Sequence, residues 1–196
     1  MLPPERETVE ELRRRPHGAV RVLVAGATSA SGSADVAAML TTALTMAGLR
    51  NDSVHVVHAG AMLDGLHSAS AAGAKRFVVV TGGGAAALAS AFAMVKAIET
   101  RHPGARIEVL VTRQDESRAH ASYLRVRSAS ERFLGREVGF AGAFPDLDAG
   151  PVGECDAADP TTRRATRASR AARIWAARLL AECSEEAWPE AAHSMD

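Results

Sequence analysis

The chain has 196 residues, which is enough for one domain with a full hydrophobic core that needs no disulfide or metal for stability. Its 23 basic and 23 acidic side chains cancel, which excludes the strong positive field of a general nucleic-acid-binding protein. Two cysteines are too few for a disulfide framework, and no apolar run approaches the roughly 20 residues of a membrane span. Because the first residues also lack a signal-peptide pattern, we expect a cytoplasmic protein. From the charge balance, we expect that it binds no nucleic acid.

Five short runs rich in β-branched residues alternate with helical patterns along the chain. Several are continuous apolar stretches, which is typical of strands buried on both faces of a parallel sheet. The strands are expected at residues 21–26, 54–60, 76–82, 106–112 and 137–144. Helices are expected at residues 33–47, 61–72, 85–101, 116–134 and 161–182. This alternation predicts an α/β fold with a doubly wound, mainly parallel sheet of about five or more strands flanked by helices.

Three segments are expected in the chain. Residues 1–17 form an N-terminal helix or flexible arm for partner binding, because a short segment with only Val9 and Leu12 as apolar anchors is marginal alone in water. Residues 18–183 form the α/β domain, and residues 184–196 form a flexible tail.

The last expected helix separates its residues into two faces. Trp175 and Leu179 share an apolar face with several alanines, so we expect this helix to pack on the domain. The arginines Arg163, Arg167 and Arg170 share another face. Contact with an acidic partner or a membrane surface is the alternative, and it is disfavoured because alanines offer little area for insertion into lipid.

The first strand runs into AGATSASGSAD, a turn of small residues that opens a helix. At such a junction, backbone N–H groups and the helix dipole can hold phosphates, but a working phosphate-binding loop also has a lysine and a magnesium-binding hydroxyl. The same spacing here gives Ser33 and Ala34, followed by Asp35, which would repel a phosphate. A tight turn with helix-capping hydroxyls is therefore favoured. Any retained nucleotide binding would fall to Gly26, Thr28, Ser29, Ser31, Gly32 and Ser33.

Two other patterns invite a functional interpretation. His55 and His58 lie three apart on an expected strand and so point to opposite faces, which means that they cannot hold one metal ion together. We therefore expect structural histidines and no metal site. The glycines at 82–84 could cradle an anion, although an ordinary turn is favoured. Asp115 and Glu116 are expected to cap a helix.

Three stretches of the chain resemble the MinD/ParA-like (SIMIBI-class) ATPases. VLVAGATSASGSADVAAML, at residues 22–40, is similar to their deviant Walker A segment, which reads GKGGxGKTT. Residues 78–99 look like the strand and helix that follow the second switch of that family. Residues 107–148, with RFLG and a later Pro-Asp, look most like the FlhG (FleN) flagellar-number regulator branch. In residues 7–15, Leu12 and Arg13 match the N-terminal DQAxxLR helix of that branch.

The chain departs from this family at the positions that handle nucleotide. The two lysines of the family fall at Thr28 and Ser33, and the magnesium threonine falls at Ala34. The Walker B aspartate falls at His58, and the base-holding asparagine falls near Thr112. A strand and a switch segment also look deleted after the first helix. Because phosphoryl transfer depends on these charges, the resemblance implies a pseudo-ATPase with no cofactor.

The resemblance thus implies a non-catalytic regulatory protein that acts by protein–protein binding in flagellar or polar assembly. The implied partner is an FlhF-like signal-recognition-type GTPase, bound through Leu12 and Arg13. Two alternatives stay open: an active, atypical ATPase that uses ATP and Mg, and a scaffold in cellulose-synthesis or secretion machinery. No oligomeric state follows from the sequence.

Overall fold

The computed structural model describes residues 20–47, 54–61, 66, 73–144 and 170–182, and these form one parallel sheet covered by helices. The strands are β1 (Val20–Gly26), β2 (Val54–Ala61), β3 (Arg76–Thr81), β4 (Arg106–Thr112) and β5 (Gly139–Phe144). The helical elements are the 3-10 turn η1 (Ser29–Ser31), α2 (Ser33–Met46), α4 (Ala85–Arg101), α5 (Glu116–Leu134) and a final helix at 170–182. The strand order is β2-β1-β3-β4-β5, so the predicted doubly wound α/β fold is confirmed.

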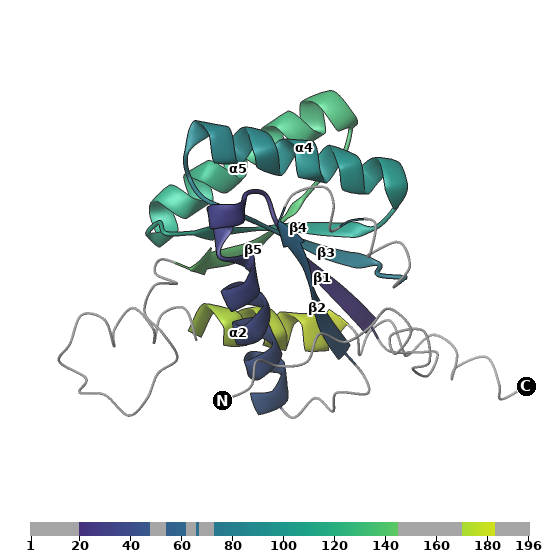
Figure 1. Cartoon of the computed structure of the whole chain (residues 1–196), viewed down its shortest axis with the longest axis vertical. Coiled ribbons are helices and arrows are strands. Elements are labelled where there is room, and N and C mark those ends of the chain that lie inside the picture. Colours follow the sequence, from purple (N-terminus) through teal and green to yellow (C-terminus); the bar gives the residue numbers. More distant parts are fainter. Residues whose placement is uncertain (1–19, 48–53, 62–65, 67–72, 145–169, 183–196) are drawn as a thin grey trace, which may run out of the picture.

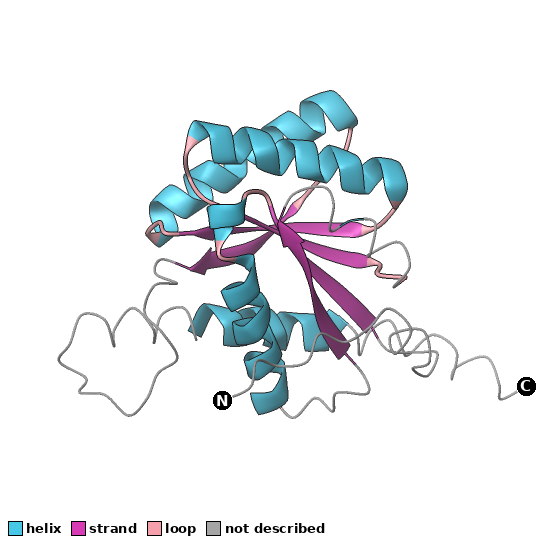
Figure 2. Cartoon of the chain, in the orientation of Figure 1, coloured by secondary structure: helices cyan, strands magenta, loops and turns pink. Residues whose placement is uncertain are grey.

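The sheet is sandwiched between two helical layers (Figure 1, Figure 2). Helices α4 and α5 cover one face, while α2 and the final helix cover the other. Neighbouring residues of β3 serve the two faces alternately, with Phe77 and Val79 in one core and Val78 and Val80 in the other. This double burial is the physical reason for the continuous apolar runs in the sequence.

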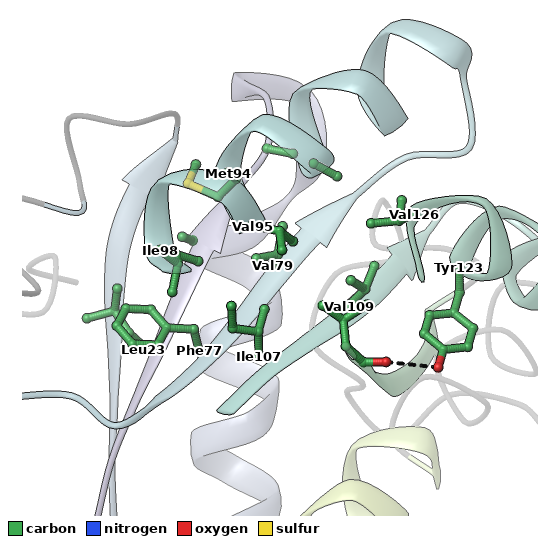
Figure 3. Close-up of a cluster of buried hydrophobic side chains, with 14 of the residues drawn as sticks. Leu23, Phe77, Val79, Met94, Val95, Ile98, Ile107, Val109, Tyr123 and Val126 are labelled. Atoms are coloured by element: carbon green, nitrogen blue, oxygen red, sulfur yellow. Dashed lines mark hydrogen bonds between the residues drawn. The ribbon is translucent and has the colours of Figure 1, made fainter. Parts of the chain in front are cut away.

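The core beneath α4 and α5 is almost entirely apolar (Figure 3). Met94, Val95 and Ile98 of α4 pack on the strands, and Tyr123 of α5 lies on the other side of the same cluster, near Val126. The Tyr123 hydroxyl donates a hydrogen bond to the backbone carbonyl of Val138 at 3.0 Å. The backbone therefore satisfies this buried hydroxyl.

The core beneath the final helix contains a buried carboxylate. Trp175 packs in this core, and its indole Nε1 donates to Oε2 of Glu108 at 2.9 Å. Arg178 donates to the other oxygen of Glu108 at 2.6 Å, so both oxygens have partners. Together with Leu179, these contacts confirm that the final helix packs on the sheet through the predicted face. Arg170 is exposed at its start.

Element bounds agree with the sequence predictions except at a few ends. The fifth strand begins at Gly139 rather than at residue 137. The helix predicted for 61–72 starts too early, because Ala61 still belongs to β2, while Leu66 is helical and buried. Other predictions lie outside the described residues: the segments 1–17 and 184–196, Leu12, Arg13, Arg163 and Arg167. Within the described ranges, no helix combines the length and apolar composition that crossing a bilayer requires.

Candidate functional site at the carboxyl ends of the strands

The strand order reverses direction at β1. The chain passes from β1 to β2 on one side and then to β3 on the other side of β1. In doubly wound sheets, ligands bind outside the carboxyl ends of the strands at such a reversal. The loops that follow β1, β3 and β4 meet here, and we call this region the carboxyl edge. It contains all the residues that the sequence analysis assigned to nucleotide binding.

The loop after β1 is folded onto itself and onto the neighbouring strands. Its backbone N–H at Ser31 donates to the carbonyl of Thr28 at 3.1 Å, which closes the turn η1. The buried hydroxyl of Thr112, at the end of β4, donates to the carbonyl of Ser31 at 3.1 Å. Gly32 then begins α2 from a left-handed conformation with φ of 72°, which favours glycine. Several backbone groups of this loop are therefore already hydrogen-bonded within the protein.

The first residue of α2 is joined to β2. Ser33 is buried, and its Oγ lies 2.9 Å from Nε2 of His58. Burial lowers the pKa of His58, and the nearby Asp35 carboxylate opposes this shift without cancelling it. His58 is therefore mainly neutral at pH 7, as suits a hydrogen bond with an uncharged hydroxyl. The positions that the family resemblance assigns to the Walker lysine and the Walker B aspartate contact each other directly.

The two serine hydroxyls of the loop converge on the last residue of β1. A Cβ placed on Gly26 would lie 2.4 Å from Oγ of Ser31 and 2.8 Å from Oγ of Ser33, so only glycine fits without movement. The Ser31 hydroxyl is buried and has no hydrogen-bond partner among the described residues. The space immediately beyond β1 is therefore occupied by the protein's own side chains.

The structure separates the six predicted nucleotide-binding residues into different roles. Ser31 and Ser33 approach Gly26, whereas Thr28 contributes a carbonyl and Gly32 a turn. Ser29 is exposed at the surface of the loop. The expected helix-capping hydroxyls are not found, since α2 has no side-chain cap and Ser33 instead contacts His58. The sequence predicted a hydroxyl that caps its own helix, whereas the Ser33 hydroxyl contacts a residue 25 positions away in the chain.

Gln114 was missed by the sequence analysis. A Cβ on Gly83 would overlap its side chain, at 1.7 Å from Nε2, so the glycine at this position allows Gln114 to lie over the loop after β3. The Ser122 hydroxyl donates to Oε1 of Gln114 at 2.8 Å and fixes the amide. The three glycines at 82–84 indicate that another group approaches the backbone closely, but they do not identify that group as Gln114.

Helix α5 begins beside this glutamine as predicted, with Asp115 accepting from the backbone N–H of Arg118 at 2.9 Å. Arg113, just before it, has a φ of 60° and donates its backbone N–H to Phe144. Across the part of the chain that the structure describes, no group of three His, Cys, Asp or Glu side chains is placed to hold a metal ion.

Comparison with known proteins finds no match, either among protein-family models or among curated protein sequences. The resemblance to the MinD/ParA ATPases therefore stays a prediction, and the geometry of the carboxyl edge supplies the physical argument about its function.

Proposed function

We propose that the protein is a non-catalytic relative of the MinD/ParA ATPases, most like the FlhG branch, that regulates by binding a protein partner in the cytoplasm. The observation that carries this proposal is the 2.9 Å contact between Ser33 and His58. It joins the two positions that the family resemblance assigns to the Walker lysine and the Walker B aspartate, which would hold phosphate and magnesium in a working site.

Charge at the carboxyl edge supports the same conclusion. The only lysines of the chain are Lys75 and Lys96, which precede β3 and lie in α4, respectively. Neither belongs to the loop after β1. In phosphoryl transfer the protein contributes mainly positioning and positive charge, so a loop of serines with Asp35 beside it lacks the main catalytic contribution. A hydroxyl-rich loop of this kind suits a structural role.

The partner is proposed to bind outside the described residues. Leu12 and Arg13 are the proposed contacts, and an FlhF-like signal-recognition-type GTPase of flagellar or polar assembly is the proposed partner. The alternative is an active, atypical ATPase, in which the Ser33–His58 contact would have to open to admit a phosphate. The titration described next distinguishes this alternative from the proposal.

The test is calorimetric titration of the full chain with ATP and MgCl2. A hydrogen bond to a charged group contributes about 1.5–3 kcal/mol, so the loss of two lysines weakens binding by at least about a hundredfold. We expect no heat of binding at micromolar ATP and no hydrolysis. Micromolar, magnesium-dependent binding would contradict the proposal.

A matched variant measures how far the site has departed from a working one. Ser33→Lys combined with Ala34→Thr supplies the Walker lysine and the magnesium hydroxyl but leaves Thr28 and His58 unchanged. We expect this variant to remain inactive, because the second lysine and the Walker B carboxylate are still missing. ATP turnover by the variant would show that the fold retains a competent site.

A further inference from the structure

An aromatic patch lies on the outer surface of α4 and α5, apart from the carboxyl edge. Phe133 near the end of α5 is 67% exposed, and its ring meets Phe92 of α4 edge to face at 6.2 Å between centroids. The guanidinium of Arg132 lies 5.4 Å from the centroid of the Phe133 ring. On α4, the exposed residues Ala89 and Lys96 flank Phe92 at helical spacing. We use the name aromatic patch for these five residues.

The patch combines apolar area with positive charge. An aromatic ring that stacks on Phe133 would gain apolar burial and a favourable ring–ring contact. Acidic side chains would form ion pairs with Arg132 and Lys96 at the rim of the patch. The chemistry of the patch therefore fits a segment that carries both an aromatic ring and carboxylates.

The described chain ends at the same end of the sheet as Phe133. Glu182, the last described residue, binds Arg106 at the start of β4 with an N–O distance of 2.5 Å. Ala105, directly before Arg106, accepts a hydrogen bond from Arg136 through its backbone carbonyl. Arg136 follows Phe133 by three residues, which is less than one helical turn. A series of contacts along the amino ends of the strands therefore links Glu182 to the helix that carries Phe133.

The sequence that follows Glu182 has the complementary composition. Residues 183–196 read CSEEAWPEAAHSMD, with four carboxylate side chains and no lysine or arginine. Trp188 lies six residues beyond Glu182, and six extended residues span up to about 20 Å.

We propose that residues 183–196 bind the aromatic patch of the same chain. Trp188 covers the ring of Phe133, while Glu185 and Glu186 lie near Arg132 and Lys96. The segment then masks an apolar surface that is otherwise open to a partner or to a second copy. This inference concerns a different surface from the carboxyl edge and does not depend on the proposed function.

The test uses acrylamide quenching of tryptophan fluorescence in the full chain. Trp175 and Trp188 are the only tryptophans, and Trp175 is 2% exposed, so quenching reports on Trp188. We expect little quenching in the wild-type chain. Phe133→Ser removes the docking ring, so the quenchable share of the emission should rise to about one half, the share of one tryptophan in two.

Matched variants make the result specific. Leu124→Ser changes another exposed apolar residue of α5 and should leave the quenching at the wild-type level. Arg132→Glu should raise quenching, and adding Glu186→Arg should reverse that rise. Full quenching of Trp188 in the wild-type chain would overturn the proposal. Protection that disappears on dilution would also overturn it, because the patch would then be covered by a second copy.

Discussion

The two ends of the sheet use polar side chains in different ways. At the carboxyl edge, the contact between Ser33 and His58 joins groups without a formal charge. At the amino ends of β3 and β4, Glu182 binds both Arg76 and Arg106 and fastens the end of the final helix to the sheet. The two ion pairs that fasten the final helix therefore lie at the end of the sheet opposite to the one where this class of fold binds ligands. The following predictions test that contrast.

The largest effect is expected from Glu182→Ala. Arg76 is buried and would lose this carboxylate, so the free energy of unfolding should fall by about 2 kcal/mol, below the full cost for a buried pair because Arg106 is half exposed. Urea denaturation measures the change. Glu131→Ala breaks an exposed pair with Arg127 and should leave the free energy of unfolding nearly unchanged. Equal effects of the two substitutions would contradict the structural importance of the Glu182 pairs.

The Glu182 effect should also depend on pH. Burial alone would raise the pKa of Glu182, but the hydrogen bonds and charges of Arg76 and Arg106 outweigh burial and lower it below the ordinary value of 4.5. A lowered folded-state pKa stabilises the protein above the ordinary value, and this stabilisation is lost as pH falls through the folded value. The stability difference between wild type and Glu182→Ala should therefore shrink in acid. A difference that stays constant well below pH 4 would argue against this charge pairing.

Gly26→Ala should have an intermediate effect at the carboxyl edge. The new methyl group would lie 2.4 Å from Oγ of Ser31, so the loop must shift at a cost near the lower end for overpacking, about 1–1.5 kcal/mol in the free energy of unfolding. Gly82→Ala is the matched control, because its methyl group would meet Ala87 at an ordinary 3.9 Å. If both substitutions are neutral in urea denaturation, the loop is looser than this structure indicates.

Ser31→Ala should have the smallest effect and the opposite sign. Its buried hydroxyl has no partner among the described residues, so removal should leave stability unchanged or raise it by up to about 1 kcal/mol. Ser122→Ala removes a hydroxyl that binds Gln114 and should instead lower stability by about 1 kcal/mol. The same substitution of Ser31 should reduce the cost of Gly26→Ala, which a double-mutant cycle measures. A marked loss of stability in Ser31→Ala would indicate a bound water or ion at that oxygen.

The sequence predicts most of the fold because local patterns determine it. The bounds of β4, α4 and α5 agree with their apolar periodicity, and Asp115 caps α5 as expected. The start of β5 was placed two residues early, since pairing with β4 begins only at Gly139. The apolar periodicity of a helix or strand can be recognised without knowing which distant residues will pack against it.

The details of the candidate site were less predictable, because they depend on tertiary contacts. Ser33 and His58 are separated by 25 residues and meet only when β2 pairs with β1. Thr112 lies 81 residues from the carbonyl of Ser31 that it holds. The sequence predicted that His55 and His58 lie on one strand, but it offered no rule that paired a serine with either ring.

The final helix has a consequence for how the protein is made. Trp175 and Glu108 are 67 residues apart, and Arg76 and Glu182 are 106 residues apart. During synthesis on the ribosome, β1, β3 and β4 emerge well before the helix that covers Leu110 and Phe144. The part of this face that α2 does not cover stays bare until the final helix arrives, so the unfinished chain exposes a surface that chaperones recognise and that favours aggregation. Translation pauses between residues 145 and 182 would lengthen this exposure.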